Sequence, residues 1–184
     1  MFIIKDNYYL YIENSSSINF NKLKKNKKIS IIYRNNGKQE ELFKLKKLKK
    51  ECKIKNYKLY IANNSKLAAA CKADGVYISS YNKKIYLNSN VIGSAHNYQQ
   101  IYEKQKQGCK TIILSRLFKT NYQNKQGYYG ITKFNIIFKN CNLRIIPLGG
   151  INSSNLLKLN LVLSKGLALL SEVKKKPVIT NRLF

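Results

Sequence analysis

The sequence lacks the features that would place a 184-residue chain in a membrane, in a secreted fold or at a structural zinc site. No stretch approaches the roughly 20 apolar residues that a membrane helix needs, so we expect no membrane-bound part. Residues 1–6 lack the basic start and long apolar run of a secretory signal, and we therefore expect a cytoplasmic protein. The cysteines are spaced too widely for a zinc ribbon or a CxxC redox pair and are expected to be free thiols: Cys52, Cys71, Cys109 and Cys141.

Arginine and acidic residues are also scarce. The formal net charge is +27, yet only four of the 35 basic residues are arginine and the rest are lysine. Arginine grips phosphates and guanines bidentately, so a nucleic-acid-binding surface usually carries more of it. Lys, Asn, Ile and Tyr are the residues that an AT-rich coding sequence favours, so we attribute the charge to compositional drift and expect no nucleic-acid partner. A basic nucleic-acid-binding protein is the alternative that charge alone supports, and the charge should attract anionic ligands of any kind.

Short strand-like runs alternate with helix-like segments along the chain. The runs expected to be strands are 8–12, 29–34, 57–61, 76–79, 91–94, 111–114, 143–146 and 166–170. The helices expected between them are 39–52, 65–72 capped by Ser65, 98–107, 133–139 and one capped by Ser153 or Ser154. The segments after the first and fourth strands look too short for full helices. This alternation indicates parallel strands joined by helical crossovers.

The number of strands and the C-terminal motif favour a closed barrel. We expect an α/β fold, a (βα)8 TIM barrel forming a single domain over residues 1–184. Some helices should be shortened, because such barrels typically take about 250 residues. A doubly wound open sheet shows the same alternation and is the alternative fold.

A glycine pair follows the seventh expected strand. Gly149 and Gly150 come directly after it, a helix start is expected at Ser153 or Ser154, and Leu170-Ser171 ends the eighth strand. Barrels of this class commonly bind phosphate on the loops after strands 7 and 8. Glycines let backbone N–H groups approach an anion closely, and a helix N-terminus adds partial positive charge. The sequence therefore predicts a phosphate site at this turn.

Several segments resemble the thiamine phosphate synthase/TenI family. Residues 146–152 (Ile-Pro-Leu-Gly-Gly-Ile-Asn) and 166–171 (Gly-Leu-Ala-Leu-Leu-Ser) are similar to the family's Gly-Gly-Ile turn and to its last strand, which closes in Ser. Residues 72–78 (Lys-Ala-Asp-Gly-Val-Tyr-Ile) resemble its Ala-Asp-Gly segment, and residues 92–97 (Ile-Gly-Ser-Ala-His-Asn) resemble its Leu-Gly-x-Ser-x-His stretch. The succession covers residues 29 to 173, and the chain is identified as a divergent member of this family of (βα)8 barrels in thiamine biosynthesis.

The resemblance implies a synthase reaction. The family's synthases join hydroxymethylpyrimidine diphosphate to thiazole phosphate and release pyrophosphate, with Mg²⁺ neutralising the leaving group. Arg34 matches the family's Arg near strand 2, and Thr120 matches a Thr in the strand 6 loop. Asn63 and Asn82 occupy the positions of two metal-binding Asp residues, and a neutral amide should bind Mg²⁺ much more weakly than a carboxylate. No metal ligand is assigned, and lysines around the mouth could neutralise pyrophosphate instead.

The family's TenI branch implies a second function that dispenses with the metal site. This branch includes a thiazole tautomerase whose proton transfer is assigned to a His that His96 matches, and an imidazole suits proton shuttling near neutral pH. A structural His96 in a barrel that only binds thiazole phosphate is the alternative. The expected partners are phosphorylated thiazole and pyrimidine ligands, and a homo-oligomer is left open. The candidate catalytic residues are His96, Arg34 and Ser94, and the candidate substrate-binding residues are Thr120, Gly149, Gly150, Leu170, Ser171, Asn63 and Asn82.

Overall fold

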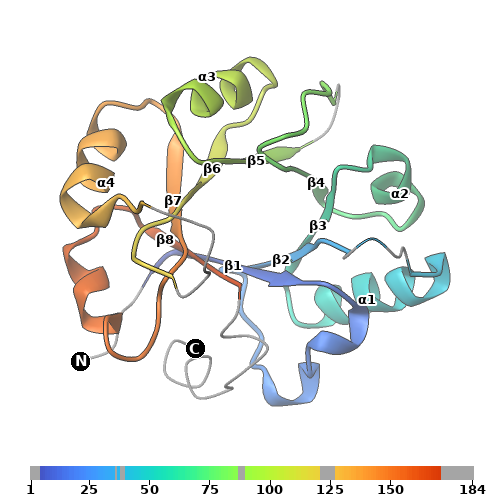
Figure 1. Ribbon diagram of the computed structural model, residues 1–184. Helices are drawn as coiled ribbons and strands as arrows, with labels where there is room; N and C mark the ends of the chain where they lie inside the picture. The colour runs from blue at the N-terminus through green and yellow to red at the C-terminus, as the bar shows by residue number, and fades with distance from the viewer. Residues whose placement is uncertain (1–4, 36, 38–39, 87–89, 121–126, 171–184) are drawn as a thin grey trace.

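The protein forms a closed barrel of eight parallel strands. The computed structural model describes residues 5–35, 37, 40–86, 90–120 and 127–170. The strands follow the sequence order around the barrel: β1 (Asn7–Ile12), β2 (Ile29–Tyr33), β3 (Lys58–Ala62), β4 (Gly75–Ile78), β5 (Val91–Ala95), β6 (Thr111–Ser115), β7 (Arg144–Leu148) and β8 (Gly166–Leu169). Figure 1 shows the strands as a ring with the helices outside it. The predicted (βα)8 barrel is confirmed.

Pairing between the last strand and the first closes the barrel. β1 lies parallel to β8, with Asn7 opposite Gly166. On its other side β8 meets β7 through one pair, Leu148 opposite Ala168. An open doubly wound sheet would leave two unpaired edges, so the alternative fold is excluded.

The helices cover the outside of the ring (Figure 1). They are α1 (Leu42–Ile54), α2 (Ser65–Ala70), α3 (Tyr98–Lys106) and α4 (Gly130–Lys139), with the 3-10 helices η1 (Ser15–Ser17), η2 (Phe20–Lys22) and η3 (Leu156–Leu161). As predicted, only η1 and η2 follow β1, and the described residues between β4 and β5 contain no helix. Within the described ranges, no helix combines the length and the apolar character needed to cross a bilayer.

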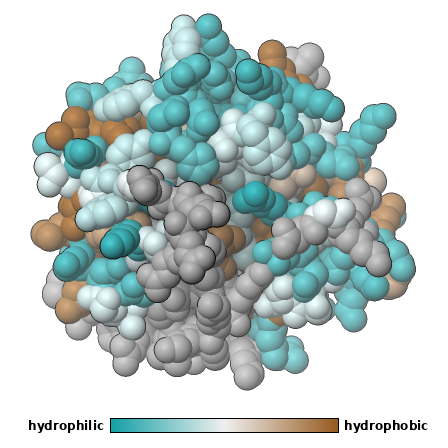
Figure 2. Space-filling view, in the orientation of Figure 1, coloured by the Kyte–Doolittle hydropathy of each residue, from teal (hydrophilic) through white to brown (hydrophobic). Residues whose placement is uncertain are grey.

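Helix α1 illustrates how a lysine-rich sequence still packs. It buries Leu45, Leu48 and Cys52 against the barrel, while most of its lysines are exposed to solvent. The described residues on the face shown in Figure 2 are mainly hydrophilic, and hydrophobic residues form separate patches among them. Cys52, Cys71 and Cys109 are buried free thiols, as the sequence predicts.

The predicted cap of α2 is wrong by one residue. The side chain of Asn64, rather than that of Ser65, accepts the backbone N–H of Leu67 at 2.9 Å. Asn and Ser are both preferred at this position and stand side by side here, so the sequence pattern alone does not choose between them.

Tyrosines fill much of the barrel interior. Side chains alternate along each strand, so β1 directs Tyr9 and Tyr11 inward and Tyr8, Leu10 and Ile12 toward the helices. Tyr60 of β3 and Tyr77 of β4 join them in the same interior cluster. The other buried members of this cluster are Ile32, Ile92, Ile113, Ile146 and Ala168. Branched aliphatic residues usually dominate such interiors, and the tyrosines add hydroxyl groups that need partners.

These tyrosines should make the folded protein less stable at alkaline pH. Burial raises the pKa of Tyr9, Tyr11 and Tyr77, and raises that of Tyr60 to about 12. Between pH 10 and 12 the folded protein therefore holds phenolic protons that the unfolded chain has lost, so stability is full below pH 10 and falls as the pH rises toward 12. We expect the free energy of unfolding, measured in urea, to drop by several kcal/mol over this range, at about 2 kcal/mol for a phenol like Tyr60.

Phenolate absorbance provides the second measurement. At pH 11 the folded protein should absorb less as phenolate than the urea-unfolded chain, because the interior phenols keep their protons, and equal absorbance would contradict their raised pKa values. Burial lowers the pKa of Lys5 and Lys104, which opposes the trend but with fewer groups. Tyr60→Phe should flatten the pH dependence of stability above pH 10, because it removes one of the shifted phenols.

Candidate functional site

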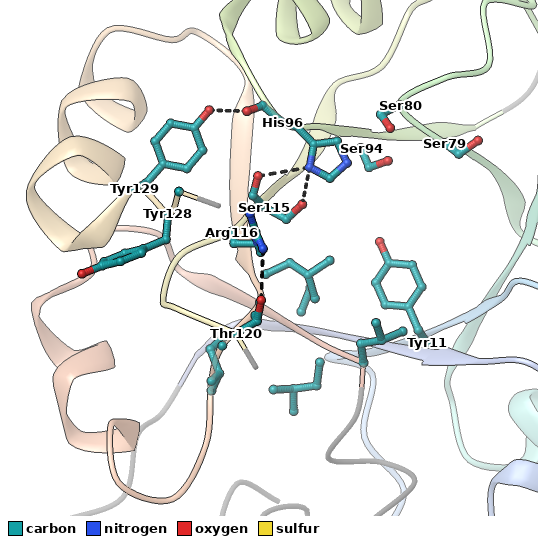
Figure 3. Close-up of a pocket in the computed structure, with 18 of the residues that line it drawn as sticks. Tyr11, Ser79, Ser80, Ser94, His96, Ser115, Arg116, Thr120, Tyr128 and Tyr129 are labelled. Carbon is teal, nitrogen blue, oxygen red and sulfur yellow. Dashed lines mark hydrogen bonds between the residues drawn. The ribbon is translucent and has the colours of Figure 1, made fainter. Parts of the chain in front are cut away.

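A cavity of about 860 Å³ opens at the carboxyl ends of the strands. In a parallel barrel these ends all lie on one side, where the loops that follow the strands surround a common mouth. The lining comes from Tyr11, Arg34, Tyr77, Ser79, Ser80, Tyr81, Ser94, His96, Ser115, Arg116, Thr120, Gly127, Tyr128, Tyr129, Lys133, Leu148, Gly149, Gly150, Ile151, Ala168, Leu169 and Leu170. Figure 3 shows many of these side chains around the cavity.

The turn after β7 has a backbone that requires glycine. Gly149 and Gly150 have φ angles of +99° and +70°, a region that L side chains rarely adopt. A Cβ atom on Gly150 would lie 2.4 Å from the carbonyl oxygen of Phe118, and one on Gly149 would lie 3.1 Å from Cγ of Arg116. The turn therefore packs directly against the loop that follows β6.

The carbonyl groups of this turn are already bound. Leu148 and Gly149 accept the backbone N–H groups of Leu117 and Phe118 at 2.9 and 3.1 Å. The carbonyl of Gly150 accepts the side-chain amide of Asn155 at 2.7 Å. No acceptor in the described part of the chain takes the N–H of Gly149 or Gly150. The turn thus lines the cavity with unused donors, which suit an anion.

The helix expected behind this turn is a 3-10 helix, η3 (Leu156–Leu161), and its predicted cap by Ser153 or Ser154 is wrong. Ser153 and Ser154 lie in a turn that leads into η3, whose N-terminus has no side-chain cap. Asn152 orders that turn instead, because its Oδ1 accepts the backbone N–H of Ser154 at 3.0 Å and that of Asn155 at 3.3 Å. No α-helix begins in this described segment, so an α-helix dipole does not contribute to the site.

Arg116 brings positive charge to the same place. Its aliphatic stem packs against Gly149, and its Nη1 donates to Oγ1 of Thr120 at 3.1 Å (Figure 3). Arg34 and Lys133 are the other cationic groups in the lining, and no Asp or Glu of the described residues lines the cavity. The net charge of the lining is therefore positive.

His96 is held at the mouth by the end of β6. Its Nδ1 lies 2.9 Å from Oγ of Ser115 and 3.3 Å from the Ser115 carbonyl oxygen, and the hydroxyl of Tyr129 donates to the His96 carbonyl (Figure 3). These contacts fix the position of the imidazole ring at the edge of the cavity. A ring placed in this way can carry a proton to or from a bound ligand.

The two asparagines in the predicted ligand set have structural roles. Oδ1 of Asn63 accepts from the N–H of Ser79 at 2.9 Å, and Nδ2 of Asn82 donates to the hydroxyl of Tyr86 at 3.1 Å. The carbonyl of Asn82 accepts from Nζ of the buried Lys104 at 2.7 Å. These bonds tie down the loops after β3 and β4, and neither asparagine lines the cavity.

The residues at the mouth do not fit the Mg²⁺ ion that the family resemblance implies. Mg²⁺ prefers charged oxygen ligands, and the described lining offers cationic side chains, hydroxyls and backbone N–H groups instead. Within the described ranges no three His, Cys, Asp or Glu residues group as a metal site would need. The donor set supports a site in which protein cations neutralise phosphate.

The structure brings most of the predicted site residues together. Those that line the cavity are Arg34, Ser94, His96, Thr120, Gly149, Gly150 and Leu170. Ser171 lies outside the described residues. Ser115 and Arg116 were not predicted as site residues, although they directly follow an expected strand, where barrel sites lie. Tyr11 was not predicted either, because every residue of the first expected strand is apolar or aromatic and the sequence does not show which side chains point inward.

This geometry defines a (βα)8 barrel with a polar, cationic cavity at its carboxyl-terminal mouth. The family model described as "Thiamine monophosphate synthase" (TMP-TENI) matches residues 20–173. The chain belongs to this family.

Similar proteins carry the same description. A thiamine-phosphate synthase of Prochlorococcus marinus is 30% identical over 135 residues, covering 70% of this chain and 39% of that protein. A thiamine-phosphate synthase of Ruminiclostridium cellulolyticum is 27% identical over 125 residues, covering 64% of this chain and 60% of that protein. The chain therefore spans about two fifths of the length of the first of these relatives. Among solved structures, thiamine phosphate pyrophosphorylase from Pyrococcus furiosus superposes with a TM-score of 0.74 at 18% identity, covering 97% of this chain and 92% of that one.

Because the Gly149-Gly150 turn is tightly packed, alanine at Gly150 should lower the free energy of unfolding more than alanine at an unpacked glycine. Gly150→Ala should destabilise the protein because the left-handed φ and the clash with Phe118 act together, for a loss of about 2–4 kcal/mol. Gly130→Ala is the matched control: its φ is +65°, but no atom lies within 4 Å of the added Cβ, so we expect a loss of about 1 kcal/mol. Urea unfolding measures both, and equal losses would contradict the tight packing of the turn.

Proposed function

We propose that the barrel binds thiazole phosphate and acts in thiamine biosynthesis, in the cytoplasm. The phosphate would accept hydrogen bonds from the N–H groups of Gly149 and Gly150 and from the guanidinium of Arg116. The observation that carries this proposal is the meeting of unused backbone donors, Arg116 and Thr120 on one side of a cavity whose described lining has no carboxylate. Relatives named thiamine-phosphate synthase supply the choice of pathway.

The first candidate reaction is the synthase reaction. It joins hydroxymethylpyrimidine diphosphate to thiazole phosphate and releases pyrophosphate, so negative charge develops on the leaving group. Arg34 and Lys133 would stabilise that charge from the cavity wall, where bulk water screens them less than on an open surface. Because the described lining offers no carboxylate to hold Mg²⁺, the proposed reaction relies on these cations instead of the metal.

A second candidate reaction, tautomerisation of a thiazole phosphate, is supported by His96. The imidazole lies at the cavity and its Nδ1 contacts Ser115, which orients the ring as proton transfer requires. The phosphate turn would serve both reactions equally. The two candidates therefore differ in whether pyrophosphate is released.

Arg116 gives the sharpest test of the phosphate site. We expect Arg116→Ala to weaken thiazole phosphate binding by about tenfold to a hundredfold, because a charge-assisted hydrogen bond to phosphate is lost. Arg144→Ala is the matched control: it removes the same charge from the exposed first residue of β7, at the opposite end of the barrel. Isothermal titration calorimetry measures both. Equal affinities for the two variants would show that general positive charge, rather than this site, attracts the ligand.

Pyrophosphate release separates the two candidate reactions. With both thiamine precursors, the synthase proposal expects release at similar rates in Mg²⁺ and in EDTA. Absence of release in both conditions would remove the synthase reaction. In that case His96→Asn should abolish exchange of thiazole ring protons with deuterated solvent, followed by NMR, while leaving thiazole phosphate affinity within about twofold of the parent, since His96 would act on protons rather than on the phosphate.

A further inference from the structure

One buried hydroxyl at the floor of the cavity has no hydrogen-bond partner in the described part of the chain. Tyr11 of β1 is 2% exposed and lines the cavity, and its hydroxyl is a buried side-chain polar atom that finds no partner among the described residues. Figure 3 shows the ring rising from β1 with its hydroxyl directed into the cavity. Leaving such a group unpaired costs stability, so a ligand that supplies the missing partner is favoured.

The ring of Tyr11 is held in a defined position. Tyr77 of β4, a strand well around the barrel from β1, packs against it edge to face, with 5.4 Å between ring centroids and an interplanar angle of 88°. Aromatic pairs favour this arrangement. The two tyrosines therefore form a fixed floor beneath the mouth.

The cavity consequently has two chemically different sides. Arg116, Thr120 and the glycine turn gather on one side, and the Tyr11 hydroxyl lies apart from them, toward Ser79 and Ser94 (Figure 3). A molecule with a phosphate at one end and a polar aromatic ring at the other would match both sides. Phosphate alone would leave the Tyr11 hydroxyl unpaired.

We propose that the Tyr11 hydroxyl donates a hydrogen bond to a ring nitrogen of the bound heterocycle, and that Tyr11 thereby makes the cavity prefer a heteroaromatic phosphate ester to a hydrocarbon one. The inference rests on the proposed function, because it concerns the ring of the ligand whose phosphate the glycine turn would hold. Burial and the neighbouring Tyr77 keep the pKa of Tyr11 well above its usual value, so the hydroxyl remains a donor at neutral pH. A neutral ring nitrogen with a lone pair is its natural acceptor.

The test removes the hydroxyl from the protein and the ring nitrogen from the ligand. Affinities of the intact chain and of Tyr11→Phe are measured by calorimetry for thiazole phosphate and for 2-phenylethyl phosphate, which keeps an aromatic ring and a phosphoethyl arm but has no ring nitrogen. We expect Tyr11→Phe to weaken thiazole phosphate binding about tenfold and to leave 2-phenylethyl phosphate binding within about twofold. Thermal unfolding without ligand should show Tyr11→Phe at least as stable as the parent, because an unpaired buried hydroxyl is removed.

Tyr60→Phe is the matched control. It removes a hydroxyl from the same barrel interior, but Tyr60 does not line the cavity and its hydroxyl accepts a bond from Asn90 at 3.2 Å. Tyr60→Phe should therefore lower stability and leave both affinities unchanged, the reverse of the result for Tyr11→Phe. If Tyr11 only packed in the barrel interior, Tyr11→Phe would not lower thiazole phosphate affinity while keeping stability.

Each outcome decides a separate point. Unchanged thiazole phosphate affinity in Tyr11→Phe, or an equal loss for both esters, overturns the role of Tyr11 while the proposed function stands. If the parent protein binds neither ester, the proposed function and this inference fail together. If the parent binds both esters equally and Tyr11→Phe changes neither affinity, the site recognises the phosphate and not the ring nitrogen, and the role of Tyr11 is overturned.

Discussion

Closure of the barrel by β1 and β8 is the constraint on which the site depends. Because every strand is parallel to its neighbours, closing the ring brings eight carboxyl ends to one mouth. Tyr11 from β1, His96 after β5 and Gly149 after β7 meet there although they are distant in sequence. On the β7 side the ladder has the single pair between Leu148 and Ala168, and Ser164, just before β8, adds a bond from its hydroxyl to the carbonyl of Ile145 in β7 at 2.8 Å.

The site combines a rigid neutral frame with a few charges. The side-chain amides of Asn63 and Asn82 form hydrogen bonds within the loops after β3 and β4. The buried Lys104 donates a hydrogen bond to the carbonyl of Asn82. The cations that line the cavity come from other parts of the barrel: Arg34 follows β2, Arg116 follows β6 and Lys133 lies on α4. None of the described carboxylates lines the cavity, and Asp74, for example, accepts the N–H of Leu59 at the start of β3. Electrostatics at the mouth therefore favour phosphate over a divalent cation.

The fold was largely predictable, and the site only in part. Strand-like runs that alternate with helix-like segments indicate parallel strands, and the glycine pair indicates the turn after β7. Both features could be predicted because they are local properties of the sequence. The cap predicted at Ser153 or Ser154 was wrong because the neighbouring Asn152 supplies the oxygen that binds the N–H groups of this turn, and the helix that follows is a 3-10 helix. The roles of Asn63 and Asn82 depend on partners from distant loops, which one sequence does not reveal. Tyr11 is hidden for a similar reason: its orphaned hydroxyl exists only once the barrel has closed around it.

The bonds from Leu117 and Phe118 to the carbonyls of Leu148 and Gly149 have a thermodynamic consequence. They join the loops after β6 and β7 into one body, so the glycine amides and Arg116 hold their relative positions before a ligand arrives. A phosphate that enters this arrangement orders few additional torsions, and little of its interaction energy is lost to conformational entropy. Affinity at such a mouth is set by preorganisation as much as by the number of contacts.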